Sequence, residues 1–432
     1  MSATEPPEPA LPTSGPQALL SRLGPGLITG AADDDPSGIA TYSQAGAQFG
    51  LGMLWTIVLT YPLMTAVQSI SARIGRVTGR GLAFNMLQVF PRWLVVLLVA
   101  SLFVANTINI GADLSAMGAA VHLVGGFNPH LFTIGFALFS LILQVAAPYH
   151  RYVKVLKWLT MALFAYVGVV FAVKIDWGQV AISIVRPNLA LTAPALTLIV
   201  ALFGTTISPY LFFWQTSEEV EDEEASNSGT LKDHPEQARA QLARIRWDTV
   251  VGMAFSNLIA FFIILTTAVT LHAHGVTDIQ TSAQAAQALK PVAGPLAFIL
   301  FSVGVIGAGL LAVPVLAGSV GYAAAEVFSW PSGLEHKALE AKGFYAVIAA
   351  AVLLGLAVDY SGLDPIKALF WSAVLNGVIS VPIMIAMMIV SARKAVMGPF
   401  RASLVQFVFG WLATLTMAVA VGGMIWLTIK PA

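Results

Sequence analysis

The chain has 432 residues, of which 57% are hydrophobic and only 10% are charged, and its 22 basic residues balance 22 acidic ones. Soluble domains carry roughly 25% charged residues, so this composition predicts a multi-pass protein that contacts the lipid bilayer. The zero net charge gives no electrostatic case for a nucleic acid partner, and the absence of cysteine excludes disulfides and thiolate metal sites.

Apolar stretches of about 20 residues, the length that crosses a bilayer, predict an all-α fold with about eleven transmembrane helices. A proline-rich segment over residues 1–20 precedes them and predicts a disordered cytoplasmic tail. Most of the 22 lysines and arginines fall in alternate loops, and basic residues gather on the cytoplasmic side. We therefore expect a cell (plasma or inner) membrane protein with the N-terminus in the cytoplasm and the C-terminus outside. The expected spans are residues 24–46, 51–72, 93–124, 131–148, 154–173, 190–216, 247–271, 294–325, 343–360, 366–391 and 404–428.

The first span contains three consecutive aspartates, Asp33, Asp34 and Asp35, followed by Pro36 and Gly38. One charge at the bilayer centre costs roughly 2.5–3.5 kcal/mol on insertion scales. Because proline removes a backbone donor and clashes with the preceding turn, we expect the helix to be unwound here. Non-helical backbone is tolerated at membrane depth only inside protein or beside water. The aspartates are therefore expected to face a central cavity; the alternative is that they cap half-helices and bind nothing.

A carboxylate beside freed backbone carbonyls is a typical ligand set for a hard divalent cation. Asp35 lies at the predicted break, and the carbonyl of Ala32 lies beside it in the sequence. A bound divalent cation would offset the cost of keeping this carboxylate ionised. We therefore predict a metal site with Asp35 and Ala32 as ligands. Asp34 is a further candidate ligand, and the role of Asp33 stays open.

The third span carries one acidic residue, Asp113, in the stretch NIGADLSAMGAA. Ionisable residues inside a membrane often mark ion or proton pathways, which makes Asp113 a candidate for proton movement. The alternative is a structural role, in which Asp113 hydrogen-bonds to Asn106, Asn109 or Ser115. The sequence leaves both interpretations open.

The sixth span contains FGTTISPYLFF, with Gly204 and Pro209 in its middle, and is expected to be broken like the first. Broken helices at matching positions of two halves indicate an inverted-repeat transporter with a site at the membrane midplane. The backbone around Thr205 and Ser208 would add oxygen ligands to that site. The predicted repeats are residues 21–186 and 187–395, with 396–432 as an appended helix.

Residues 217–246 depart from the apolar pattern because they are first acidic and then basic. Such charge blocks are typical of solvated segments, so we expect a cytoplasmic loop and the start of the next helix. The alternative is a vestibule that attracts cations, formed by Glu218, Glu219, Glu221, Asp222, Glu223 and Glu224.

The stretches GPGLITGAADDDPSGIATYSQAGAQFG and SARIGRVTGRGLA resemble the Nramp (natural resistance-associated macrophage protein) divalent-metal transporters, in a divergent branch of bacterial type. The resemblance implies a LeuT-like fold of two inverted five-helix repeats. It places Asp35 at the family's metal-binding aspartate and Ala32 at its carbonyl donor. Gly38 stands where the DPGN motif of the family has asparagine, and Ser208 stands where its MPH motif has methionine.

Other family positions also differ. Tyr210 and Gln215 replace two histidines of the sixth helix. The pair Asp113-Leu114 resembles a third-helix DL pair whose aspartate is associated with proton movement, but Ala116 stands where the family has a glutamate. The tenth-helix motif aligns poorly, and Asn376 or Ser380 is the candidate polar group there. Whether protons are partners in symport therefore stays open.

These differences bear on the choice of ion. Thioether sulfur selects softer metals, whereas carboxylate, carbonyl, hydroxyl and water suit Mg²⁺ and Mn²⁺. The missing asparagine at Gly38 would leave room for the waters that Mg²⁺ retains. This pattern resembles the magnesium-associated branch more than the iron and manganese branch, although the magnesium branch retains the asparagine. We expect Mg²⁺ or Mn²⁺ to be favoured over softer metals.

The sequence therefore predicts a secondary-active or gradient-driven transporter of divalent metal ions that works by alternating access. We expect no enzymatic activity, because the sequence holds no nucleophile–base arrangement and no Walker motif. We expect no cofactor other than the transported cation and no obligate protein partner. Two alternatives remain: a LeuT-like transporter of a small organic cation or amino acid with Asp35 as counter-ion, and a membrane metal sensor that signals through residues 217–246 without transport.

Overall fold

The computed structural model describes residues 29–30, 32–146, 161–187, 192–226, 228–334 and 337–429. These ranges hold α-helices, short 3₁₀ turns and loops, and no strand. The predicted tail over residues 1–20 and the first part of the predicted span 154–173 lie outside them. Nine stretches of the described chain are long and apolar enough to cross a membrane, and a tenth candidate is a pair of helices bent by 117°. The predicted all-α membrane fold is confirmed.

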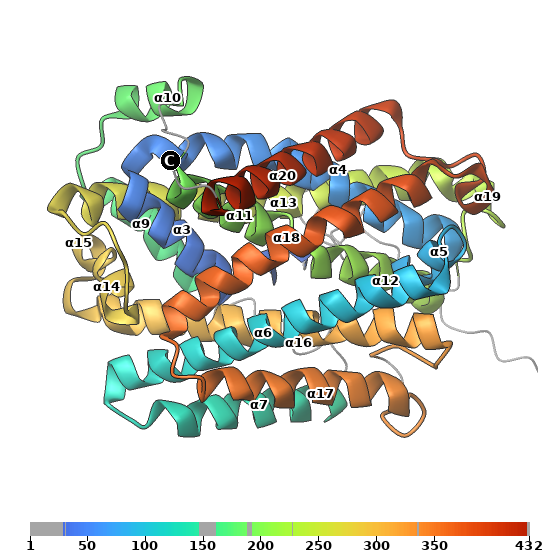
Figure 1. The fold of residues 1–432 in the computed structure, drawn as a ribbon, viewed down its shortest axis with the longest axis horizontal. Coiled ribbons are helices and arrows are strands. Elements are labelled where there is room, and N and C mark those ends of the chain that lie inside the picture. Colours follow the sequence, from blue (N-terminus) through green and yellow to red (C-terminus); the bar gives the residue numbers. More distant parts are fainter. Residues whose placement is uncertain are drawn as a thin grey trace, which may run out of the picture.

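Two predicted spans, 24–46 and 51–72, lie in one continuous stretch of the structure. There α3 (Pro36–Phe49) joins α4 (Leu54–Thr78) through the 3₁₀ turn η1 (Gly50–Met53). Figure 1 shows α3 and α4 leaving this junction in different directions. The bent pair consists of η2 with α9 (Met161–Leu163 and Phe164–Ala172) and α10 (Trp177–Val185).

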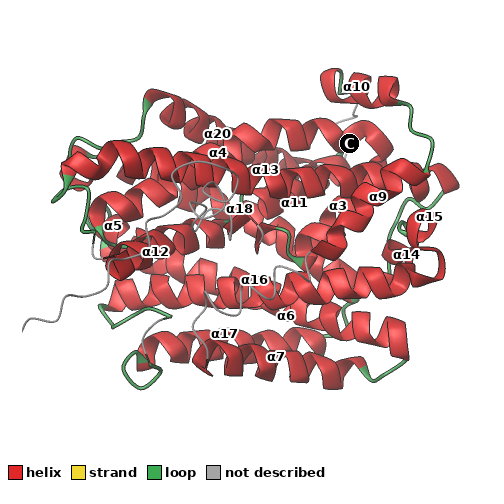
Figure 2. Ribbon diagram, turned by 180° about the vertical axis from the view of Figure 1, so that it is seen from behind, coloured by secondary structure: helices red, strands yellow, loops and turns green. Residues whose placement is uncertain are grey.

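The long helices form two layers with the broken helices between them (Figures 1 and 2). One layer contains α6 (Arg92–Gly125), α7 (Pro129–Ala146), α16 (Ala297–Phe328) and α17 (Lys342–Asp359). The other contains α4, α13 (Ala238–Thr270), α18 (Pro365–Ala392) and α20 (Leu404–Ile429). Both α3 and α12 (Pro209–Ser226) contact helices of the two layers, and α11 (Ala193–Thr206) packs on α3, α18 and α20.

The packing of α11 on α18 depends on Gly204. A Cβ atom added at Gly204 would lie 2.1 Å from the carbonyl oxygen of Ala373 and 2.5 Å from the amide nitrogen of Gly377. Both atoms belong to the backbone, so no side-chain movement relieves the overlap. Small residues let membrane helices approach closely, and here glycine places the end of α11 directly against α18.

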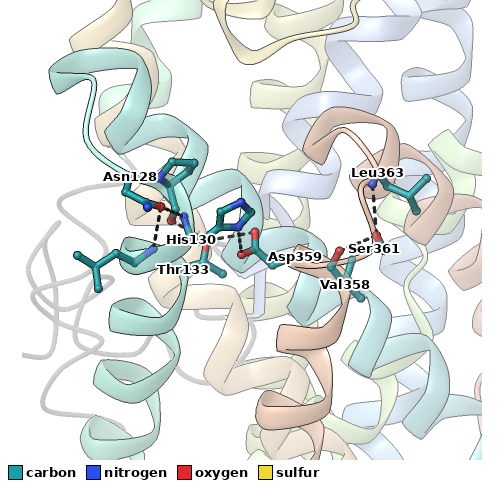
Figure 3. Close-up of polar contacts among 9 residues, drawn as sticks. Asn128, His130, Thr133, Val358, Asp359, Ser361 and Leu363 are labelled. Carbon is teal, nitrogen blue, oxygen red and sulfur yellow. Dashed lines mark hydrogen bonds and ion pairs between the residues drawn. The ribbon is translucent and has the colours of Figure 1, made fainter.

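Polar contacts tie α7 to α17 at one end of the first layer (Figure 3). His130 Nδ1 and Asp359 Oδ2 lie 2.6 Å apart, and Thr133 donates to the other carboxylate oxygen of Asp359 at 3.4 Å. The ring of Tyr360 stacks on that of His130 with centroids 5.5 Å apart. These contacts fix the two outermost helices of this layer to each other.

The short elements gather at two opposite ends of the bundle (Figures 1 and 2). The helices α5 (Leu82–Leu87) and α19 (Lys394–Met397) lie at the end predicted to be cytoplasmic, called the inner end below. The helices α14 (Ser282–Gln287) and α15 (Lys290–Ala293) lie at the outer end. The loops that were predicted to lie on the same side of the membrane therefore lie at the same end of the bundle. Which end faces the cytoplasm stays a prediction. Further 3₁₀ turns are η3 (Pro235–Gln237), η4 (His272–His274) and η5 (Gly294–Leu296).

The charged segment 217–246 differs from the predicted loop. Helix α12 continues through its acidic part to Ser226, and α13 begins at Ala238. Glu219 is fully buried, and its carboxylate accepts a hydrogen bond from Arg244 Nη2 at 2.6 Å. Glu221 and Glu224 instead line a cavity of about 440 Å³ at the inner end. Glu219 therefore belongs to a buried ion pair, whereas Glu221 and Glu224 belong to the wall of a cavity.

Candidate cation site

The first predicted break is confirmed at Asp35. The chain is helical at residues 32–33, leaves the helix at 34–35, and begins α3 at Pro36. Asp35 has extended backbone dihedrals (φ −71°, ψ 169°), and its Oδ1 accepts a hydrogen bond from the amide of Gly38 at 2.6 Å. Aspartate is a preferred N-cap and proline a preferred first helical residue. The pair Asp35-Pro36 therefore starts a new helix in the buried interior of the bundle.

The second predicted break is confirmed at Ser208. Helix α11 ends at Thr206 and α12 begins at Pro209. The hydroxyl of Ser208 donates to the carbonyls of Gly204 at 2.8 Å and Thr205 at 2.9 Å. The Ser208 hydroxyl thereby satisfies backbone carbonyls in the last turn of α11, where the helix supplies too few amide donors.

The two breaks meet inside the bundle. The hydroxyl of Tyr210 donates to the carbonyl of Ala32 at 3.4 Å. A Cβ atom on Gly38 would lie 3.2 Å from Thr205 Oγ1 and equally close to the ring of Tyr42. The space beside Gly38, where the resemblance implies an asparagine, is therefore narrow. Every residue of this cluster is at most 2% exposed: Ala32, Asp35, Tyr42, Thr205, Ser208 and Tyr210.

A chain of amide and carboxyl groups links this cluster to α6 and α18. The side-chain nitrogen of Asn109 donates to Asp35 Oδ2 and to Asp113 Oδ2, each at 3.1 Å. The amide of Asn376 donates to the side-chain oxygen of Asn109 at 3.0 Å. Asn106 is turned elsewhere and donates to the carbonyl of Leu316. Of the sequence candidates, Asp113 and Asn376 therefore belong to the site, and Asn109 joins them to Asp35.

The three consecutive aspartates do not share one environment. The hydroxyl of Ser256 on α13 lies 2.6 Å from Asp33 Oδ2 and 3.2 Å from Asp34 Oδ1. Asp35 instead bonds to the amide of Gly38 and to Asn109 on α6. The structure thus separates Asp34, a candidate ligand from the sequence, from the partners of Asp35. Ser256 had no sequence signal, since a single serine in an apolar helix is common.

Two other candidates lie away from Asp35. The side-chain oxygen of Gln215 accepts a hydrogen bond from Thr29 Oγ1 at 2.5 Å, on the half-helix before the first break. Ser380 donates to the carbonyl of Gly377 in its own helix at 2.8 Å. Gln215 therefore joins the two broken helices without reaching the cluster around Asp35.

The cluster offers oxygen ligands of mixed type. Within the described ranges, no three His, Asp or Glu side chains are placed to hold a metal ion. A cation bound here would use one carboxylate from Asp35 together with carbonyl and hydroxyl oxygens and water. Hard cations such as Mg²⁺, Ca²⁺ and Mn²⁺ accept such ligands.

Comparisons with known proteins give the family and the fold. The family model described as Nramp, natural resistance-associated macrophage protein-like, matches residues 26–427. The divalent metal cation transporter MntH of Deinococcus radiodurans is 26% identical, over 96% of this chain and 92% of the relative. A manganese transporter of Eremococcus coleocola has a similar fold, with a TM-score of 0.76 at 16% identity over 97% of this chain and 90% of that one. The nucleobase-cation-symport-1 transporter MHP1 is also similar, with a TM-score of 0.55 at 12% identity over 95% of this chain and 93% of that one.

Proposed function

Because the chain belongs to the Nramp family, we propose that it carries divalent metal ions across the membrane by alternating access. The observation that carries the proposal is the carboxylate of Asp35, which is 2% exposed and lies where two broken helices meet. A charge at that depth is costly unless something neutralises it, and a divalent cation does so. The relatives called divalent metal cation transporters support the same substrate class.

In this proposal the ion is held by Asp35, by the carbonyl of Ala32 and by oxygens near Thr205 and Ser208, with waters completing its shell. Tyr210 holds the Ala32 carbonyl through its hydroxyl. Rocking of the broken helices against the two layers would expose the ion to each side in turn. The proposed repeats at residues 21–186 and 187–395 would each supply one of the two broken helices.

We further propose that Mg²⁺ or Mn²⁺ is preferred to softer metals. The side chain at the second break is the hydroxyl of Ser208, and hydroxyl oxygen is a harder ligand than thioether sulfur. The manganese transporter with a similar fold supports Mn²⁺ as one candidate.

Reconstitution into liposomes tests the function. We expect the protein to accumulate Mn²⁺ or Mg²⁺ inside vesicles along an imposed gradient, while vesicles without protein do not. A trapped pH-sensitive dye reports whether protons accompany the metal through Asp113. Binding of these ions without uptake would favour a metal sensor. Uptake of a small organic cation or amino acid without metal uptake would favour the other LeuT-like alternative, and either result would contradict the proposal.

Replacing Ser208 with methionine is expected to shift the preference toward softer metals. The thioether adds a soft ligand and removes a hydroxyl, so the uptake ratio of Cd²⁺ to Mn²⁺ should rise several-fold. Ser208→Leu is the matched control, because leucine and methionine have similar volumes and only methionine brings sulfur. An equal change in both variants would show that size, not ligand type, sets the preference.

A further inference from the structure

A cavity of about 430 Å³ opens at the outer end of the bundle. It lies among α3, α11 and α18, which pack on one another and lie side by side in both ribbon views (Figures 1 and 2). Its wall includes two glutamines of α3, Gln44 and Gln48, and two charged residues, Asp278 and Lys367. We call this space the outer cavity.

The outer cavity points toward the candidate cation site. Ala40, Gln44 and Gln48 line it at intervals of four residues, and so mark one face of α3. Ala40 lies five residues after Asp35, which is about 7.5 Å along the helix axis. A separate, very small cavity is lined by both Ala40 and Pro36, and it shares the lining residues Ala40 and Ile366 with the first. The outer cavity therefore lies on the outer-end approach to Asp35, within about two helical turns of it.

Asp278 is held in place at the mouth of the outer cavity. Gln44 donates from its side-chain nitrogen to Asp278 Oδ1 at 3.4 Å and accepts from the amide of Ile279 at 2.9 Å. Gln280 donates to the other carboxylate oxygen of Asp278 at 2.9 Å. All these donors are neutral, so the negative charge of Asp278 is positioned without being cancelled by them.

Lys367 brings the opposite charge to the same wall. It lies near the start of α18, its side chain is exposed, and it forms no ion pair within 4 Å in the described part of the chain. A fixed positive charge lowers the local concentration of cations in a cleft, and it repels a doubly charged ion twice as strongly as a singly charged one.

We propose that Lys367 limits the rate at which divalent cations enter the outer cavity, and that Asp278 opposes it. This inference rests on the proposed transport of divalent cations. It assigns two residues outside the cation site to the control of entry. Because the effect is electrostatic, it acts on uptake at low ion concentration and leaves the maximal rate unchanged.

A charge series at position 367 tests the inference in liposomes with Mn²⁺ as the probe. At an ionic strength of about 0.01 M, where the Debye length is about 30 Å, Lys367→Gln should raise kcat/KM several-fold without changing kcat. Lys367→Glu should raise it further, Lys367→Arg should match the wild type, and Asp278→Asn should lower it. At about 1 M, where the Debye length falls to about 3 Å, the differences should shrink.

Lys394→Gln is the matched control, because it removes an exposed lysine at the inner end, just beyond the same helix. Equal uptake by the glutamine and arginine variants would overturn the inference, as would a gain that persists at high salt or that Lys394→Gln reproduces. A wild-type protein that takes up no divalent ion would instead contradict the proposed function, and with it any role of Lys367 in entry.

Discussion

Asp35→Asn is expected to reduce divalent-metal uptake in liposomes at least about a hundredfold while the protein still folds. Asparagine is as good an N-cap as aspartate, so the bond to the Gly38 amide is kept and only the charge is lost. Removal of residues that merely orient metal ligands typically costs 10- to 100-fold in affinity or activity, and loss of the only carboxylate ligand should cost no less. The measurement is the initial rate of Mn²⁺ uptake.

The substitution separates the two interpretations of this aspartate. If Asp35 only caps α3, the asparagine variant should transport normally, and such a result would remove the proposed site. Asp176→Asn is the matched control, because Asp176 caps α10 through the amides of Gly178 and Gln179. It should leave uptake unchanged. A thermal-unfolding curve in detergent shows whether both variants remain folded.

Arg244→Leu is expected to lower the free energy of unfolding by about 3 kcal/mol. The substitution leaves Glu219 fully buried without its partner at 2.6 Å. Removing one member of a buried ion pair typically costs about 3–5 kcal/mol, because an uncompensated charge remains. The low end is expected here, since the Arg244 side chain is 21% exposed. The measurement is denaturant-induced unfolding in detergent micelles.

The double variant Glu219→Gln with Arg244→Leu should recover most of this loss, because no unpaired charge is then buried. Arg246→Leu serves as the control, since Arg246 is exposed on the same helix. Equal destabilisation by Arg244→Leu and Arg246→Leu would show that the buried pair has no special importance.

Much of the fold was accessible from the sequence because its signals are local. The apolar stretches indicate the helices, and the pairs Asp35-Pro36 and Ser208-Pro209 determine the local backbone. The structure confirms both breaks. Family resemblance, now confirmed over residues 26–427, pointed to Asp35 and Ala32 as candidate ligands. The helical end of α12 was harder to predict, because a run of charged residues is typical of a solvated loop. The burial of Glu219 depends on its ion pair with Arg244, which lies 25 positions away, so the local sequence did not predict it.

The remaining parts of the site depend on which helix faces meet. Asn109 precedes Asp113 by one helical turn, so a shared face was predictable. Its contact with Asp35 was not, because it joins residues 74 positions apart. Ser256 lies 222 positions from Asp34 and gave no signal at all. Its hydroxyl contacts Asp33 and Asp34, whereas Asp35 caps α3.

Helix α12 begins at Pro209, directly after the unwound Ser208, and carries Glu219 nearer its other end, so one helix joins the centre of the bundle to its inner end. Its 18 residues span about 27 Å, and a tilt of about 10° about Pro209 would displace the far tip by about 5 Å. The helix would then act as a lever. Glu219 lies about 15 Å from Pro209 along the helix, so the same tilt would displace it by about 2.6 Å. A displacement directed away from α13 would break the 2.6 Å contact with Arg244 unless α13 moved together with α12.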